Sequence, residues 1–245
     1  MIGQDIKSIN VKRFNLVVGP KRSGKTHLIQ ELSKINNTVM EIIYELDADK
    51  VREIINSSHA ITTRKYIVIQ NGDFISPKNQ NMMLKILEET PDKLTIFIEA
   101  LNENKIIRTI KSRANVIKLK SYSQSQIKQV VDIEELVPYC NNIGEAMFLK
   151  NFSYQQYIDF SVRLQKTISE LTFRNLFMVA NHTDVTSGGL DMEILFIFLN
   201  RVFEDYNMLQ IIADFEQKFK NKSFNKLMLL DRMVISMWEV AREQN

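Results

Sequence analysis

The sequence has a single cysteine, Cys140, among its 245 residues. One cysteine excludes an intrachain disulfide and a zinc cluster built from cysteines, and it suits a reducing compartment. Long apolar runs are also missing, because a stretch such as residues 194–199 is far shorter than the roughly 20 residues of a membrane-spanning helix. The N-terminal residues show no apolar signal-peptide core. We therefore expect a cytoplasmic protein with no membrane partner.

A strong charge of either sign is missing as well. The 32 lysines and arginines against 29 acidic residues leave a net charge of only +3, so a basic patch for nucleic acid would have to be local. With 44% apolar and 25% charged residues, the composition is that of an ordinary globular protein of one to three domains. We find no low-complexity linker and no internal repeat.

The clearest motif is the phosphate-binding pattern of residues 19–26, which matches G-x-x-x-x-G-K-[ST] at every fixed position. A β-prone run precedes it and a segment with helical apolar spacing follows, so backbone N–H groups of the turn and the helix start can surround an anion. We expect Lys25 to reach the β- and γ-phosphates of ATP or ADP, and the Thr26 hydroxyl to bind Mg²⁺. The alternative is a chance glycine turn before a helix. The predicted nucleotide-binding residues are Gly19, Pro20, Lys21, Arg22, Ser23, Gly24, Lys25, Thr26 and His27.

The first half of the chain alternates between β-prone and helical segments. Apolar or β-branched runs, as expected of strands buried on both faces, occur at residues 14–18, 39–46, 66–69, 94–98 and 116–119. The segments between them have helical spacing; one opens at Ser76 and Pro77, and another covers residues 106–110. This alternation predicts an α/β fold with a parallel sheet and helices on both faces.

The second half is helical. Short helices at residues 123–131 and 143–149 predict a small lid, and residues from Tyr154 onward predict an all-α domain with a loop at Ser187-Gly188-Gly189. We divide the chain into a nucleotide-binding domain (1–120), a lid (121–152) and a helical oligomerisation domain (153–245). An apolar stripe along the last helix joins Leu227, Leu230, Val234, Met237, Trp238 and Ala241.

The acidic pair that a hydrolysing P-loop protein needs is missing from its usual place. That pair follows a neighbouring buried strand, where it holds the Mg²⁺ shell and polarises the attacking water. Here the strand at residues 66–69 is followed by the neutral Gln70 and Asn71, which cannot take a proton; losing a catalytic base costs about 10²–10⁴ in rate. Asp73 or Asp47 could substitute as the metal-holding acid, or each could be a turn or helix-entry residue. The site is expected to bind nucleotide better than it hydrolyses it.

Four segments, in this order, resemble bacterial clamp-loader ATPase subunits of the AAA+ class, with the delta-prime type of DNA polymerase III as the nearest likeness. They are residues 16–26, 45–48 (Glu-Leu-Asp-Ala), 83–91 (Met-Leu-Lys-Ile-Leu-Glu-Glu-Thr-Pro) and 109–113 (Thr-Ile-Lys-Ser-Arg). The resemblance covers residues 14–149. It implies a RecA-like AAA+ domain, a helical lid and a helical collar. It also implies a hetero-oligomeric ring with other clamp-loader ATPase subunits, which loads a sliding clamp onto primed DNA as part of a polymerase holoenzyme.

The departures from the family pattern favour a subunit with weak hydrolysis. Gln70 and Asn71 match the delta-prime type, the polar sensor residue expected near Ala100 is missing, and Gly144 stands where active subunits carry arginine. The family's four-cysteine zinc insertion is absent. The chain is also shorter than usual, which is compatible with a phage-type version.

The resemblance assigns one role in trans, to Arg113. In the family this arginine projects toward the γ-phosphate of the neighbouring subunit, where such a finger contributes about 10³–10⁵ in rate. The alternative is an ordinary surface cation. A group of cations near it is either an anion-facing surface or a solvated charged face: Lys105, Arg108, Lys111, Lys118 and Lys120. Lys85 could contact DNA phosphates by analogy with the family, or be a plain exposed lysine.

Two other functions remain open from the sequence. One is a self-sufficient AAA+ ATPase in which Asp73 or Asp47 restores metal binding. The other is a nucleotide-binding interaction module outside replication.

Overall fold

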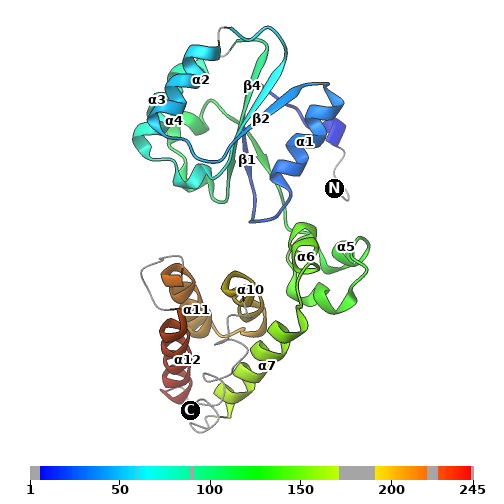
Figure 1. Cartoon of the computed structure of the whole chain (residues 1–245), viewed down its shortest axis with the longest axis vertical. Helices are drawn as coiled ribbons and strands as arrows, with labels where there is room; N and C mark the ends of the chain where they lie inside the picture. The colour runs from blue at the N-terminus through cyan, green and yellow to red at the C-terminus, as the bar shows by residue number, and fades with distance from the viewer. Residues whose placement is uncertain (1–5, 59, 89–90, 171–190, 220–225, 244–245) are drawn as a thin grey trace. The chain divides into compact units, whose positions relative to one another are not determined.

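Five parallel strands form a single sheet in the N-terminal half of the chain, in the order β2-β3-β4-β1-β5 (Figure 1). The strands are β1 (Phe14–Val18), β2 (Val39–Ile43), β3 (Lys65–Ile69), β4 (Leu94–Ala100) and β5 (Asn115–Lys118). The computed structural model describes residues 6–58, 60–88, 91–170, 191–219 and 226–243. The described residues confirm the α/β class predicted from the alternation of segments.

The chain divides into two compact units. The first comprises residues 1–132 together with 141–145, and the second comprises 133–140 together with 146–245. The three-part division drawn from the sequence stays a proposal, with the lid segment shared between the two units.

The helices of the first unit lie on both faces of the sheet. Helix α1 (Lys25–Ile35) covers one face, and α2 (Ala48–Ser58), α3 (Pro77–Glu88) and α4 (Arg108–Lys111) cover the other (Figure 1). The remaining elements of this unit are short: η1 (Ile6–Ser8), η2 (Gly72–Phe74), η3 (Glu103–Lys105) and α5 (Gln124–Lys128). The segment expected to be helical at residues 106–110 is therefore split, with η3 before it and α4 beginning only at Arg108.

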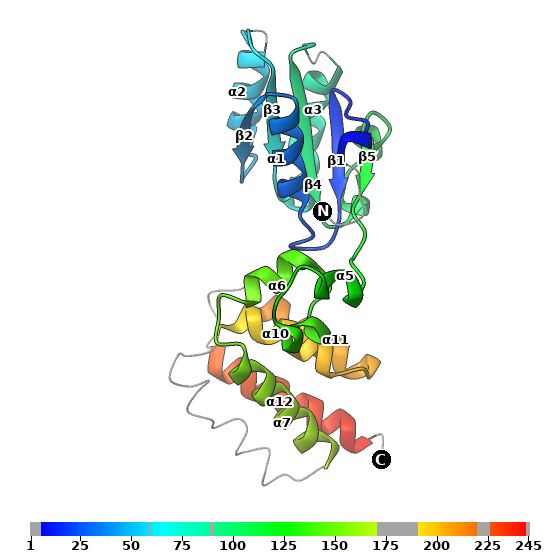
Figure 2. The same ribbon diagram turned by 90° about the vertical axis from the view of Figure 1, so that its right-hand side faces the viewer.

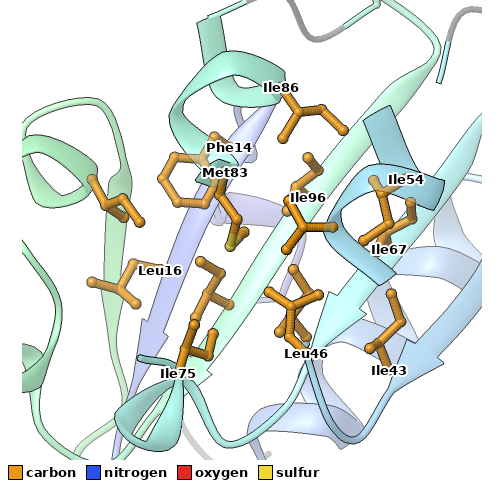
Figure 3. Close-up of a cluster of buried hydrophobic side chains, with 14 of the residues drawn as sticks. Phe14, Leu16, Ile43, Leu46, Ile54, Ile67, Ile75, Met83, Ile86 and Ile96 are labelled. Atoms are coloured by element: carbon orange, nitrogen blue, oxygen red, sulfur yellow. The ribbon is translucent and has the colours of Figure 1, made fainter. Parts of the chain in front are cut away.

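Alternation of side chains along each strand explains the two apolar cores. On β3 and β4, Ile67, Ile69, Ile96 and Ile98 point to the α2–α3 face, where they pack with residues such as Met83 (Figure 3). Val68 and Phe97 point to the other face and pack beneath Leu28, Ile29 and Leu32 of α1. This parity continues past the ends of the strands, so Gln70 and Glu99 share the α1 face with Val68 and Phe97.

All five strands run in the same direction, so their carboxyl ends gather at one edge of the sheet (Figure 2). Within the ladder Val18 pairs with Ala100, and Ile69 pairs with Ile98. Ligands of open α/β sheets bind at this edge, at the point where successive connections switch faces. Here β1 is followed by α1 on one face, whereas β2, β3 and β4 are followed by α2, α3 and α4 on the other face. The switch therefore lies at the end of β1.

The second unit is all-helical. Its described elements are η4 (Glu134–Tyr139), most of α6 (Ile143–Leu149), α7 (Gln155–Ser169), α10 (Met192–Val202), α11 (Tyr206–Phe219) and α12 (Lys226–Glu243). Phe198 of α10 lies between Tyr157 and Tyr139, with ring centroids 5.9 and 5.0 Å away.

The apolar stripe predicted on the last helix is buried where it is described, except for Trp238, which is half-buried. Leu230, Val234, Met237 and Ala241 are at most 7% exposed. The burial of Leu227 and the predicted loop at Ser187-Gly188-Gly189 lie outside the described residues. None of the described helices combines the length and the apolar character that crossing a membrane requires.

Candidate nucleotide site

The turn between β1 and α1 has the backbone geometry of a phosphate-binding loop. The Gly19 N–H donates to the carbonyl oxygen of Ala100 (3.1 Å), which anchors the start of the turn to β4. A Cβ at Gly19 would lie 2.8 Å from Ser23 Oγ and 3.0 Å from Leu119 Cβ, so this position requires glycine. Gly24 caps the helix at φ 89°, a left-handed conformation that glycine adopts without strain, and Arg22 is also left-handed at φ 59°.

The N-terminus of α1 supplies donors for an anion. The first helical hydrogen bond runs from the Leu28 N–H to the Gly24 carbonyl (2.8 Å), so the preceding N–H groups of the first turn have no intrahelical acceptor. The first turn carries no acidic residue, which leaves the positive end of the helix dipole uncompensated there. Ser23 is buried in the turn, and its Oγ has no hydrogen-bond partner among the described residues.

Lys25 folds over the turn rather than away from it. Its Nζ donates to the carbonyl oxygens of Gly19 and Pro20, at 2.8 Å each. Burial lowers the pKa of Lys25, and the charges of Glu99 and Asp73 oppose that shift. The ammonium is therefore already held at the mouth of the loop by acceptors that an anionic ligand could replace.

A chain of side chains joins the ends of β3 and β4 to Thr26. Gln70 Nε2 donates to Thr26 Oγ1 (2.9 Å), and Thr26 Oγ1 donates to Glu99 Oε2 (3.0 Å). The Thr26 hydroxyl is thus held from two sides, by an amide at the end of β3 and by a carboxylate at the end of β4. Asn71 takes no part in this chain, since its Nδ2 donates to the carbonyl of Tyr44 (3.4 Å).

Glu99 is the functional residue that the sequence reasoning missed. The residue is 6% exposed, and its Oε1 has no hydrogen-bond partner within the described part of the chain. Burial raises the pKa of Glu99, opposed by the Thr26 hydrogen bond and by the charge of Lys25. The sequence predicts no polar sensor residue near Ala100, and Glu99 beside it was not singled out. The available signal was an acid two positions after the apolar Phe97, where strand alternation directs it to the α1 face.

The two acids offered from sequence as substitutes are both bound to backbone. The Asp73 carboxylate accepts from the N–H groups of Leu101 (2.6 Å) and Asn102 (2.8 Å), which ties the turn after β4 to η2. Asp47 Oδ1 accepts from the Lys50 N–H (2.7 Å) at the start of α2. Their geometry is that of turn and helix-entry residues, and the metal role of Asp73 stays a prediction.

The segment at the start of α6 packs directly on the phosphate-binding turn. Asn142 is buried, and its Nδ2 donates to the carbonyl of Lys21 (3.2 Å). A Cβ at Gly144 would overlap with the carbonyl oxygen of Arg22. Residue 144 therefore lies so close to the loop that no side chain fits between them.

Comparisons with known proteins agree with this architecture. Residues 4–123 match the family described as DNA polymerase III, delta subunit. A solved DNA polymerase III gamma subunit-related protein of Thermotoga maritima is 16% identical, with a TM-score of 0.55 over 97% of each chain.

The chain is thus similar to clamp-loader proteins over residues 4–123, just under half of its length, and shares the fold of the gamma subunit-related protein. A RuvB mutant of Thermotoga maritima shares the fold at 11% identity, with a TM-score of 0.51 over 88% of this chain and 73% of that chain. No similar sequence is found among the curated proteins.

The residues of this site fit a nucleotide with bound Mg²⁺. The first-turn N–H groups and Lys25 suit phosphate, and the Thr26 hydroxyl suits the metal. Bound Mg²⁺ would neutralise phosphate charge. Within the described residues no cluster of three or more His, Cys, Asp or Glu could hold a metal by itself, so the nucleotide would have to complete the shell.

Arg113 lies at the opposite edge of the sheet from the phosphate-binding loop. It follows α4 and precedes β5, whose first residue pairs with Asn15 and whose last pairs with Val18. The four residues of β5, about 13 Å at ~3.3 Å per residue, separate Arg113 from the loop of its own chain. Arg113 Nη2 is paired with Glu88 Oε1 (2.8 Å), and Nη1 donates to the Thr109 carbonyl (3.1 Å).

The other cations singled out from the sequence are at the surface. Lys118 pairs with Glu103 (2.8 Å), so this cation and Arg113 are balanced by nearby acids. Lys85 and His27 are exposed. Of the predicted nucleotide-binding residues, His27 is the one whose side chain points to solvent from the first turn of α1. His59 and His182 lie outside the described residues.

Proposed function

We propose that this chain is a delta-prime-type clamp-loader subunit, which binds ATP or ADP with Mg²⁺ and hydrolyses it slowly or not at all. It works in the cytoplasm, in a hetero-oligomeric ring with other clamp-loader ATPase subunits, and takes part in loading a sliding clamp onto primed DNA. The observation that carries this proposal is a complete phosphate-binding loop beside a β3 end with neutral residues, Gln70 and Asn71. The likeness to a polymerase III gamma-related protein supports the same role.

In this role Arg113 acts on the nucleotide of a neighbouring subunit. Its own loop is out of reach across the sheet, so any phosphate it contacts belongs to another chain. The guanidinium is half exposed and paired with a half-exposed acid, Glu88. A surface pair of this kind is worth at most about 1 kcal/mol, so exchanging Glu88 for a phosphate costs little. A planar, permanently charged fork suits bidentate contact with phosphate oxygens.

The test is a mixed reconstitution of the clamp loader with Arg113→Ala in this chain. We expect the ATPase rate of the partner subunits to fall by about 10³–10⁵, because the finger stabilises charge in their transition state. Arg113→Lys should also lose most of the stimulation of the partner ATPase, since lysine lacks the planar guanidinium fork. Arg108→Ala, which removes an exposed guanidinium from the preceding helix α4, is the matched control. An unchanged partner rate with Arg113→Ala would remove the finger from the proposal.

A self-sufficient ATPase is the second candidate, and Glu99 is the observation that favours it. A buried carboxylate against Thr26 restores one acid to the site. Purified chain with saturating ATP and Mg²⁺ separates the two, because steady turnover that Lys25→Ala abolishes would favour the self-sufficient enzyme. Recovery of this chain with partners unrelated to a polymerase or a clamp would favour an interaction module outside replication.

A further inference from the structure

Glu99 is the one strongly buried acid in the described part of the nucleotide-binding unit whose carboxylate has an oxygen to spare. Oε2 accepts from Thr26, whereas Oε1 has no hydrogen-bond partner among the described residues. A buried charged group without its full set of partners is costly to keep, so its presence needs a cause. The charge of Lys25 acts on Glu99, but the Lys25 ammonium is hydrogen-bonded to the carbonyls of the loop.

The position of Glu99 suits a hard divalent cation that also touches Thr26. Mg²⁺ takes oxygen ligands at 2.0–2.1 Å in octahedral geometry, so two neighbouring ligand oxygens lie about 2.9 Å apart. The separation of Thr26 Oγ1 and Glu99 Oε2 is 3.0 Å. Gln70 reaches the same hydroxyl, but through its Nε2, which donates a hydrogen bond and cannot bind a metal.

The sheet order explains how the acid comes to stand on β4. β4 lies between β3 and β1, so its end, like that of β5, is next to the phosphate-binding loop. Glu99 pairs in register with Val17, two residues before the loop begins. Side chains from both strand ends reach Thr26, and Glu99 is the one of the two that has a carboxylate.

We propose that Glu99 is the carboxylate that recruits Mg²⁺–nucleotide to this chain, in place of the acid that the end of β3 lacks. This inference rests on nucleotide binding at the loop of residues 19–26, as proposed above. Glu99 is then occupied with the metal or one of its waters, and among the described residues no second acid contacts Thr26 to act as a general base. A metal-binding carboxylate on β4 thus agrees with tight binding and slow hydrolysis.

The test measures the dissociation constant of ADP by calorimetry, with excess Mg²⁺ and with EDTA, for wild type and Glu99→Gln. Glutamine keeps the shape and a carbonyl oxygen for the Thr26 hydroxyl, and circular dichroism checks that the variant folds. We expect Mg²⁺ to lower the dissociation constant of ADP for wild type. In Glu99→Gln this Mg²⁺-dependent increase in affinity should be smaller by roughly 10–100-fold. In EDTA the variant should bind as well as wild type or better, because a negative charge near the phosphates is gone.

Two further variants make the result specific. Glu103→Gln removes a half-exposed acid that pairs with Lys118, and it should keep the full Mg²⁺ effect. Asp73→Asn tests the acid predicted from sequence, and it too should keep the Mg²⁺ effect. If Asp73→Asn loses it while Glu99→Gln keeps it, the metal belongs to Asp73 and the inference is wrong.

The outcomes separate this inference from the proposed function. Binding by wild type that is equal in Mg²⁺ and EDTA overturns the role of Glu99 and leaves nucleotide binding intact. Loss of affinity in Glu99→Gln that is equal in both conditions shows a structural role only. No binding of ADP by wild type in either condition overturns both the nucleotide-binding part of the proposed function and the inference.

Discussion

The ends of β3 and β4 lie side by side at the carboxyl edge of the sheet, yet they differ in charge. β3 is followed by Gln70, a neutral amide, whereas β4 carries the buried carboxylate of Glu99. Both side chains contact the same atom, Thr26 Oγ1, from opposite sides. The nucleotide site therefore contains an acid although β3 supplies none. This is possible because neighbouring parallel strands end at the same edge of the sheet, so β4 can supply the acid instead.

The acids at this edge also differ in how fully they are used. Both carboxylate oxygens of Asp73 accept from backbone N–H groups, and Asp47 accepts from the Lys50 N–H through Oδ1, so both acids hold turns in place. Glu99 holds only the Thr26 hydroxyl. The number of acids near the strand ends does not tell an acid that holds a turn from an acid that faces Thr26. The hydrogen bonds distinguish the two.

The largest effect on the free energy of unfolding is expected from displacing the phosphate-binding loop, which lies beside the ends of β3 and β4. A Cβ in Gly144→Ala would overlap with the Arg22 carbonyl, so the segment of residues 141–145 must leave the loop or the loop must move. We expect the free energy of unfolding to fall by about 2 kcal/mol, as for other overpacked sites. Urea unfolding followed by circular dichroism measures it.

Met147→Ala, at an exposed position of the same helix, is the control and should change the free energy of unfolding by less than about 0.5 kcal/mol. An unfolding midpoint in Gly144→Ala equal to that of wild type would show that the loop does not depend on this contact.

A smaller effect is expected from placing an acid on both strand ends. Gln70→Asp removes a donor to Thr26 and sets a second carboxylate near Glu99, and like charges in one site oppose each other. We expect a loss of roughly 1–2 kcal/mol in the free energy of unfolding at pH 7.5.

Combining Gln70→Asp with Glu99→Gln moves the acid from β4 to β3. The loss should then be relieved by a coupling of about 1 kcal/mol, and the Mg²⁺ effect on ADP binding should return. Gln70→Asn, neutral and equally short, separates the effect of length from that of charge. Strictly additive effects would mean that the two strand ends do not sense each other.

The smallest effect concerns the pH dependence of stability at the β4 end. Because burial raises the pKa of Glu99, the native state binds its proton more tightly than the unfolded state does. The stability of wild type therefore falls as pH rises through the window between the ordinary glutamate pKa, ~4.3, and the raised value. Glu99→Gln removes this loss, so it should be more stable than wild type at pH 7.5, by about 1 kcal/mol.

Below the ordinary glutamate pKa the difference should vanish, because both states of wild type are then protonated. Thermal unfolding from pH 4 to 8 measures this. Glu103→Gln should behave in the opposite sense, since Lys118 lowers the pKa of Glu103 and the charged form favours the fold. A Glu99→Gln variant less stable than wild type at pH 7.5 would contradict the burial argument.

Much of this molecule follows from local sequence. The phosphate-binding turn is eight consecutive residues between a β-prone run and a helix, so the local sequence determines its conformation. The five strands follow from apolar runs buried on both faces, and only their ends differ, as where β2 stops at Ile43 rather than at residue 46. The helix expected at residues 106–110 forms only in part, because α4 begins at Arg108 and residues 106 and 107 lie between η3 and α4.

The sequence by itself determined a P-loop in a parallel α/β domain, a neutral end on β3 and a helical second half, because these depend on composition and spacing along the chain. Tertiary structure alone decided which acid meets Thr26. Glu99 is 73 residues away from Thr26 in sequence, and only the order of the strands and the parity of β4 bring the two side chains together. It likewise decided that Asp73 is consumed by backbone and that Gly144 touches the loop, since both depend on contacts between segments far apart in the chain.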